Sequence, residues 1–151
     1  MTQYDIDLEL SDQEMHLYSR QILLDGWDIE AQEKLKLANV LIVGCGGIGC
    51  TTAELLARAG VGQITLIDAD TIEMSNLQRQ MAYVEENIGF YKSEILAKRL
   101  KQINPYIRVE SQTVKLDQSN AEQLISNQDL VLDGCDNFTT RYLVNQICKQ
   151  F

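Results

Sequence analysis

The feature that most constrains the fold is a glycine-rich run directly after a short apolar segment. Residues 40–43 read Val-Leu-Ile-Val, and residues 44–49 read Gly-Cys-Gly-Gly-Ile-Gly. A continuous apolar run of this length is typical of a buried strand in a parallel sheet. Apolar residues at helical spacing then follow, at Ala53, Leu55, Leu56 and Ala59. The glycines are therefore expected to join a buried strand to a helix.

Helical and strand patterns alternate along the rest of the chain. After an acidic arm over residues 1–12, residues 12–38 predict two helices divided by Gly26. Further strands are predicted over 64–67, 107–114 and 130–132, and helices over 92–103, over 119–126 with Ser119 as N-cap, and from Thr139 onward. This alternation predicts the α/β class, with a Rossmann-like doubly wound, mainly parallel sheet and N-terminal helices. We expect the sheet to be incomplete after its fourth strand and the following helix.

The glycine spacing indicates a nucleotide site. Gly44 permits a tight turn, Gly46 lets the backbone approach a phosphate, and Gly49 lets the helix pack closely on the strand. The helix then offers free N–H groups and the positive end of its dipole. Asp68 follows the second strand, 19 positions after Gly49, where it can accept hydrogen bonds from ribose hydroxyls. The alternative is that these glycines only make a tight turn.

Net charge decides how an anion could be held. The 151 residues include 13 Lys and Arg against 22 Asp and Glu, for a net charge of −9. This balance disfavours nucleic acid as a partner, so any phosphate ligand needs a local group of cations. We expect Arg20, Arg79 and Lys92 at the same edge of the sheet, although each alone could be a solvated surface residue. Lys92 opposes a helix dipole, which favours a bound anion there.

Asp136 lies just after the fourth predicted strand, where ligands bind in open α/β sheets. A carboxylate repels a triphosphate unless a cation lies between them, and Mg²⁺ commonly binds one or two carboxylates plus phosphates. Asp136 is therefore a predicted magnesium ligand. It could also cap the helix that begins near Thr139, and the two roles are compatible.

Other chemistry is limited by the remaining residues. His16 is the only histidine, so the chain has no second histidine from which a Ser-His-Asp or Cys-His relay could be built. The cysteines show no metal-binding spacing and are expected to be small buried residues: Cys45, Cys50, Cys135 and Cys148. The longest apolar run is four residues, and the acidic N-terminus lacks the layout of a signal peptide. We expect a cytoplasmic protein without a membrane partner.

Several blocks occur in an order that resembles the MoeB/ThiF/HesA family, the bacterial relatives of ubiquitin-activating enzymes. The resemblance covers residues 18–151, and residues 26–35, 60–70 and 103–110 place it nearer the molybdopterin-pathway branch than the thiamine-pathway branch. The blocks are Arg20-Gln21-Ile22-Leu23-Leu24, the glycine-rich loop, Asp68-Ala69-Asp70, Ser75-Asn76-Leu77-Gln78-Arg79-Gln80, Lys92, Ile103-Asn104-Pro105 and Asp133-Gly134-Cys135-Asp136-Asn137.

The resemblance implies an adenylyltransferase that uses ATP and Mg²⁺. Its substrate would be the C-terminal Gly-Gly carboxylate of a ubiquitin-like sulfur-carrier protein, MoaD-like or ThiS-like. Residues 1–38 would then be an arm with helices, and residues 39–151 an ATP-binding domain that is incomplete at its carboxyl end. The family's zinc site and sulfur-transfer cysteine would lie after residue 151.

The family's functional residues carry over to matching positions. Arg20, Arg79, Lys92 and Asp136 would be catalytic, with Asp136 on the metal and Arg20 inserted into a neighbouring subunit of a homodimer. Asp68 would hold the ribose, and Asn76 and Arg79 would face the phosphates. The full set of implied nucleotide contacts is Gly44, Gly46, Gly47, Gly49, Asp68, Asp70, Ser75, Asn76, Leu77, Gln78, Arg79, Lys92, Asp136 and Asn137.

Three alternatives stay open at this point. The glycine-rich loop also fits an NAD-dependent oxidoreductase half-domain. The same family includes a branch that dehydrates a modified adenosine in transfer RNA, which the acidic balance disfavours. The chain could also be a non-catalytic nucleotide-binding or dimerisation fragment.

Overall fold

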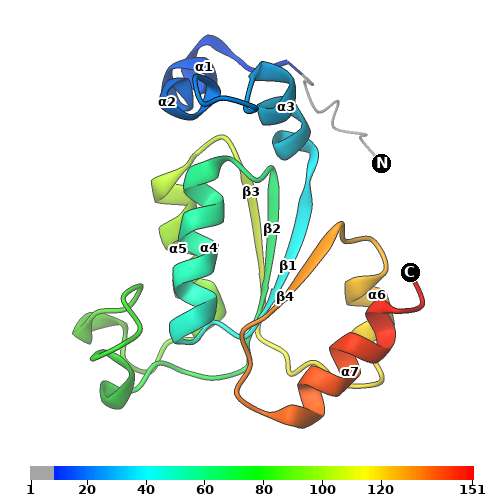
Figure 1. Ribbon diagram of the computed structural model, residues 1–151. Coiled ribbons are helices and arrows are strands. Elements are labelled where there is room, and N and C mark those ends of the chain that lie inside the picture. Colours follow the sequence, from blue (N-terminus) through cyan, green and yellow to red (C-terminus); the bar gives the residue numbers. More distant parts are fainter. Residues whose placement is uncertain (1–8) are drawn as a thin grey trace, which may run out of the picture.

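A four-stranded parallel sheet forms the centre of the molecule (Figure 1). The computed structural model describes residues 9–151, so residues 1–8 of the predicted arm over 1–12 lie outside the described part of the chain. The strands are β1 (Asn39–Val43), β2 (Gln63–Ile67), β3 (Arg108–Gln112) and β4 (Leu130–Asp133). Their order is β3-β2-β1-β4, and the pairing is parallel throughout.

The strand order reverses at β1, which is the topological switch point of the sheet. Val40 pairs with Ile64 of β2 on one side and with Leu130 of β4 on the other. The chain therefore winds outward from β1 to β3 and then crosses back to β4. Ligands of open α/β sheets bind outside the carboxyl ends of the strands at such a point.

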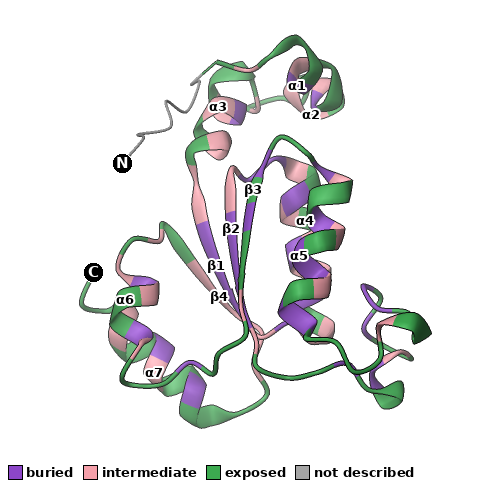
Figure 2. Ribbon diagram, turned by 180° about the vertical axis from the view of Figure 1, so that it is seen from behind, coloured by how far each residue is buried: buried purple, intermediate pink, exposed green. Residues whose placement is uncertain are grey.

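Helices cover both faces of the sheet, and this confirms the doubly wound prediction (Figures 1 and 2). On one face lie α4 (Gly47–Ala59) and α5 (Lys92–Ile103), and on the other lie α6 (Ala121–Ile125) and α7 (Phe138–Cys148). Ile42, Ile64 and Leu66 belong to the core under α4 and α5. Leu41 and Ile67 face the opposite way and pack with residues of α6 and α7. Alternate residues of each central strand thus enter different cores.

Three short helices lie at the amino ends of the strands: α1 (Asp12–Leu17), α2 (Ser19–Ile22) and α3 (Ile29–Leu37). The sequence predicted two helices here, and the difference is a break at Tyr18. Tyr18 is 3% exposed, and Asn104 Nδ2 donates a hydrogen bond of 2.7 Å to its hydroxyl. The buried ring anchors these helices to the domain, where a single helix from residue 12 to the division at Gly26 was expected.

Other element boundaries also differ from the sequence prediction. The third strand ends at Gln112 and not at 114, because its partner Ile67 is the last residue of β2. Ser119 does not cap the next helix, whose N-cap is Asn120, because the Ser119 hydroxyl and N–H both donate to Asp117. Between β2 and α5 the chain makes two 3₁₀ turns, η1 (Met74–Asn76) and η2 (Glu85–Asn87). None of the helices within residues 9–151 has the length and apolarity to cross a bilayer.

Candidate functional site

A cavity of about 640 Å³ opens at the carboxyl ends of the strands. It lies at the switch point, because residues at or just after the ends of β1, β2, β3 and β4 all line it. The cavity brings together most of the polar residues that the sequence singled out: Gly44, Gly46, Gly47, Asp68, Asp70, Arg79, Lys92, Asp136 and Asn137.

The glycine-rich loop has the geometry that its spacing predicted. Gly44 has a φ of +92°, and a Cβ there would lie 2.9 Å from the Gly134 carbonyl. A Cβ on Gly49 would lie 1.8 Å from the Gly44 oxygen, so the close packing of α4 on β1 requires glycine. Gly46 differs, since the nearest neighbour of its Cβ would be the Gln80 Nε2 at 3.7 Å. The space beside Gly46 belongs to the cavity.

The amino end of α4 faces this cavity without a side-chain cap. Gly46 is the N-cap, and no side chain accepts from the first-turn N–H groups. Gly46, Gly47 and Ile48 all line the cavity. Uncapped N–H groups at the positive end of a 13-residue helix are suited to an anionic group.

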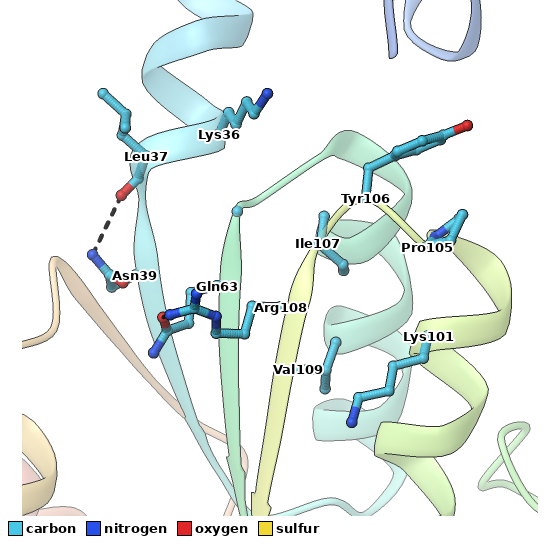
Figure 3. Close-up of a pocket in the computed structure, with 11 residues that line it drawn as sticks. Lys36, Leu37, Asn39, Gln63, Lys101, Pro105, Tyr106, Ile107, Arg108 and Val109 are labelled. Atoms are coloured by element: carbon cyan, nitrogen blue, oxygen red, sulfur yellow. Dashed lines mark hydrogen bonds between the residues drawn. The ribbon is translucent and has the colours of Figure 1, made fainter. Parts of the chain in front are cut away.

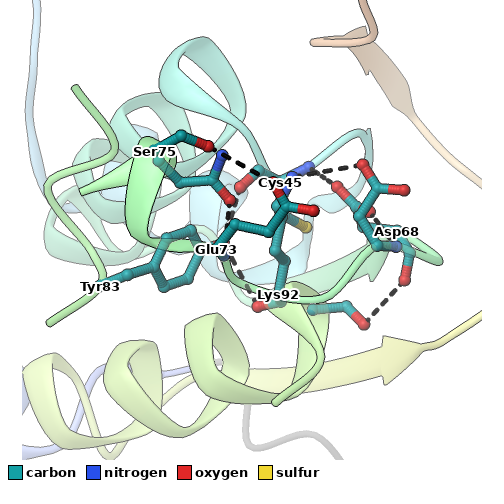
Figure 4. Close-up of polar contacts among 9 residues, drawn as sticks. Cys45, Asp68, Glu73, Ser75, Tyr83 and Lys92 are labelled. Carbon is teal, nitrogen blue, oxygen red and sulfur yellow. Dashed lines mark hydrogen bonds and ion pairs between the residues drawn. The ribbon is translucent and has the colours of Figure 1, made fainter. Parts of the chain in front are cut away.

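Asp68 is fixed by the backbone at both carboxylate oxygens (Figure 4). Cys45 N–H donates to Oδ2 at 2.7 Å, and Asp70 N–H donates to Oδ1 at 2.7 Å. Each carboxylate oxygen can accept a second hydrogen bond, so the group can still take two hydroxyl donors. This arrangement ties the end of β2 to the glycine-rich loop and suits the predicted ribose contact.

Lys92 is the first residue of α5, and its largely buried side chain lines the cavity. Its side chain is 9% exposed, and its Nζ lies 3.2 Å from Asp70 Oδ2. The Asp70 side chain is 75% exposed, so solvent can replace it easily. Lys92, the cation at the start of α5, is therefore paired with an exposed carboxylate, and it lines the cavity.

The segment at residues 75–80 contributes fewer cavity residues than the resemblance implied. Of its six residues, Arg79 and Gln80 line the cavity, whereas Ser75, Asn76, Leu77 and Gln78 do not. Asn76 is 7% exposed, and its Oδ1 accepts the Glu73 N–H at 3.0 Å. The Ser75 hydroxyl donates to Glu73 at 3.4 Å (Figure 4). Ser75 and Asn76 therefore shape the turn that presents Arg79.

Asp136 and Asn137 have separate positions at the end of β4. Asn137 is the N-cap of α7 and accepts the Thr140 N–H at 2.9 Å, so the alternative role of Asp136 as the cap is wrong. The Asp136 carboxylate lines the cavity, and within residues 9–151 it makes no hydrogen bond or ion pair. No group of three metal-ligating side chains occurs among the described residues. A Mg²⁺ ion held by Asp136 would draw its other ligands from phosphates and water, as this ion commonly does.

Arg20 is not at this edge of the sheet, which corrects the expectation from the sequence. It belongs to α2, at the amino ends of the strands and thus at the opposite end of the molecule from the glycine-rich loop (Figure 1). The reason is topological, because the N-terminal helices lead into β1 at its start and the cavity lies where β1 ends.

Four polar cavity residues escaped the sequence reasoning: Gln80, Lys115, Thr140 and Arg141. Lys115 follows β3, so the rule that ligands bind after strand ends could have found it. Arg141 is in the first turns of α7, with its Nε 3.6 Å from Asp133 Oδ2. Gln80 is buried and carried no sequence signal beyond its place after Arg79.

A second cavity, of about 630 Å³, lies at the amino ends of the strands (Figure 3). Lys36, Lys101 and Arg108 line it. The adjoining helices α3 and α5 end here, and the negative ends of their dipoles oppose an anion. The Lys36 ammonium is already paired with Glu14 at 3.0 Å, and we place the functional site at the first cavity, where the uncapped α4 terminus lies.

The reactive side chains near the first cavity are held in their neutral forms. Burial raises the pKa of the Cys45 thiol, and burial likewise raises the pKa of the Tyr83 hydroxyl, which donates to Cys45 O at 2.6 Å. Burial and a hydrogen bond to Asp133 raise the pKa of the Cys135 thiol. These groups do not supply a nucleophile at neutral pH. The cavity instead presents uncapped N–H groups together with the cations Arg79 and Lys92.

The fold and the cavity define a class: a Rossmann-like domain with a glycine-rich turn between β1 and α4 and cations that converge on it. Within this class, the chain belongs to the ThiF family, whose model matches residues 18–151. The chain is 48% identical over 140 residues to the molybdopterin-synthase adenylyltransferase of Salmonella typhimurium, covering 93% of this chain and 56% of that protein. It is 44% identical to the sulfur carrier protein adenylyltransferase of Thermus thermophilus, covering 88% of this chain and 49% of that protein.

Solved structures agree with this assignment. The E. coli tRNA N6-threonylcarbamoyladenosine dehydratase in complex with ATP superimposes with a TM-score of 0.87 at 31% identity, covering 93% of this chain and 57% of that one. The chain thus spans about half the length of the curated relatives it matches.

Proposed function

We propose that the protein activates a protein carboxylate by adenylation with ATP. The observation that carries the proposal is the convergence at one cavity of the uncapped α4 terminus, Asp68, and the cations Arg79 and Lys92. The relatives named adenylyltransferases support the reaction class. The solved neighbour with bound ATP supports the nucleotide.

The proposed reaction is an in-line attack of the carboxylate on the α-phosphate, with pyrophosphate as the leaving group. The carboxylate is itself the nucleophile, so the raised thiol pKa values are no obstacle. The α4 terminus and Lys92 would orient the phosphates, and Arg79 would neutralise charge on the leaving group. Asp68 would hold the ribose and fix the α-phosphate relative to these groups.

Asp136 is the proposed magnesium ligand. Its exposed carboxylate at the cavity edge fits an ion that takes one protein ligand together with phosphate oxygens. Bound there, the ion would neutralise phosphate charge. Asn137 would keep the carboxylate in place, because its capping bond fixes the start of α7.

The proposed partner is a ubiquitin-like sulfur-carrier protein, MoaD-like or ThiS-like, with a C-terminal Gly-Gly. The names of the most similar curated relatives support this class. We further propose a homodimer, in which Arg20 acts in the neighbouring subunit's cavity. Its position on α2, at the far end from the cavity of its own chain, is compatible with such an exchange.

Carrier-dependent exchange of radiolabelled pyrophosphate into ATP tests the proposal. Arg79→Ala and Asp136→Ala should each abolish the exchange in the intact protein, because each removes a group that balances phosphate charge. Lys98→Ala removes an exposed cation from α5 that does not line the cavity, and it should exchange like the wild type.

Near-normal exchange in both cavity variants would contradict these roles. Exchange that occurs with a modified transfer RNA but not with a carrier protein would favour the dehydratase branch. Binding of NAD in preference to ATP and Mg²⁺ would favour the oxidoreductase alternative.

A further inference from the structure

Arg141 lines the cavity but has no part in the proposed reaction. It lies near the amino end of α7, where the helix dipole disfavours a cation. Its side chain is 47% exposed, and its Nε lies 3.6 Å from Asp133 Oδ2, which is too far for a good hydrogen bond. Exposed ion pairs of this kind contribute little to stability. The place of this cation in the fold therefore calls for a further reason.

The guanidinium group of Arg141 is fixed against the turn that precedes α7. Its Nη2 donates a hydrogen bond of 2.9 Å to Cys135 O, and its Cζ lies 5.9 Å from the centre of the Phe138 ring. Because a peptide unit is planar, the bond to Cys135 O fixes the plane of the peptide that joins Cys135 to Asp136. Arg141 thus orients the backbone directly before Asp136.

The Asp136 carboxylate takes its position from this turn. The residue is exposed, and its side chain makes no hydrogen bond or ion pair in the described part of the chain. The backbone on its strand side is held by Cys135 N–H, which donates to Asp133 Oδ1 at 2.9 Å, and on its helix side Asn137 caps α7. Arg141 adds the contact that reaches from the helix back to the strand end.

We propose that Arg141 is a positioning residue for magnesium, which acts by fixing the turn that carries Asp136. This inference rests on the proposed function, since it requires Asp136 to hold the ion. Removing a group that orients a metal ligand typically lowers metal affinity by about tenfold to a hundredfold. Arg141 needs no contact with the nucleotide for this role, because its hydrogen bond is made to the protein backbone.

Calorimetric titration with ATP, once with Mg²⁺ and once with a chelator in its place, tests this role. Arg141→Met removes the guanidinium group and keeps an unbranched side chain. We expect the Mg²⁺–ATP complex to bind about tenfold more weakly, because Asp136 loses its fixed orientation. Metal-free ATP should bind within about twofold of the wild type. Loss of a phosphate contact or of a nearby charge would instead weaken metal-free ATP at least as much, because this form is more negative.

Asp136→Ala shows whether Arg141 acts through Asp136. In this background no carboxylate is left to position, so adding Arg141→Met should weaken the binding of Mg²⁺–ATP by less than about twofold. Arg58→Met is the matched control, because Arg58 pairs with Glu54 on α4 and does not line the cavity. This variant should bind both forms of ATP like the wild type.

Arg141→Gln is the second variant, for use if Arg141→Met fails to fold by circular dichroism. Glutamine is polar and suits a half-exposed position, but it is shorter than arginine and withdraws the donor from Cys135 O. We expect the same selective loss of Mg²⁺–ATP binding.

Three results would overturn the inference: unchanged binding of Mg²⁺–ATP in a folded Arg141 variant, equal loss with and without the metal, or a full further loss in the Asp136→Ala background. Failure of the wild type to bind ATP would instead overturn the proposed function. Normal binding of Mg²⁺–ATP by Asp136→Ala would overturn the proposed magnesium ligand, and the inference with it. These two proteins therefore separate failure of the proposed function from failure of the role given to Arg141.

Discussion

At the scale of single residues, Gly46 and Gly49 belong to the same loop, but glycine is required at the two positions for different reasons. Gly49 has no room for a side chain, because a Cβ would overlap the Gly44 oxygen. Gly46 has room on the protein side, and the space beside it is the cavity. One glycine therefore serves packing, and the other leaves space for a ligand.

Alanine substitutions should separate these two roles. Gly49→Ala should lower the free energy of unfolding by about 2 kcal/mol or more, since overpacking shifts α4 away from β1. Gly46→Ala should change stability by less than about 1 kcal/mol, yet weaken ATP binding. Urea denaturation and calorimetric titration measure the two effects. An equally destabilised Gly46→Ala would contradict this division.

The sequence placed these glycines, Asp68 and Lys92 correctly in the fold, because strand ends and helix starts follow from local patterns. It could not predict that Gln80 lines the cavity, because this side chain is buried between segments that are remote in sequence. It misplaced Arg20, because helical periodicity does not say at which end of a sheet a helix lies. The sequence offered Asp136 as a possible cap of α7, whereas the geometry identifies its neighbour Asn137.

At the scale of elements, a small polar cluster holds the N-terminal helices together. Glu14 is 5% exposed, accepts from Ser11 in a capping box, and lies 3.0 Å from Lys36 Nζ of α3. Burial raises the pKa of this carboxyl group, but hydrogen bonds from Ser11 and Lys36 outweigh burial, and the net pKa is lowered. The charged form of Glu14 thus connects α1 to α3.

Glu14→Gln should therefore destabilise the fold in a pH-dependent way. Glu14 has a lower pKa in the folded chain than in the unfolded chain, where it is about 4.5. The charged carboxylate therefore stabilises the fold at any pH above 4.5, and this contribution is lost as the pH falls through the folded-state pKa. Urea denaturation at pH 7 should show a loss of about 1 kcal/mol. The difference from the wild type should shrink as the pH falls below 4.5.

Glu30→Gln is the control for this cluster. Glu30 pairs with Lys34 within α3, but both side chains are more than 70% exposed, at 74% and 72%. Such pairs contribute little, so this variant should denature like the wild type at each pH. A pH-independent effect of Glu14→Gln would contradict the linkage to its carboxyl group.

At the scale of the whole molecule, Arg20 and Arg79 lie at opposite ends of one chain. Under our proposal they meet only when Arg20 of one protomer enters the cavity of its partner. In a symmetric dimer of identical chains, each protomer would supply its Arg20 to the cavity of the other. Both cavities are then completed together.

Mixing two inactive variants tests this arrangement. Arg20→Ala and Arg79→Ala homodimers should each lack carrier-dependent exchange. After subunit exchange, half of the dimers should be mixed, and each should contain one intact site of two, which restores about a quarter of the wild-type rate. No recovery, with mixed dimers demonstrated by differential tags, would show that Arg20 does not act in the partner's site.

The cavity has a further consequence, because it draws residues from the ends of all four strands. A ligand that binds only this assembled form raises its unfolding free energy by about 2.7 kcal/mol at a concentration 100 times its dissociation constant. Backbone amides of β1 to β4 should therefore exchange with deuterium more slowly, by up to about a hundredfold where exchange requires global unfolding. Strand β3, whose first residue is far from the bound nucleotide, should gain this protection as fully as β1. A small molecule at one rim would thus slow solvent access across the entire sheet.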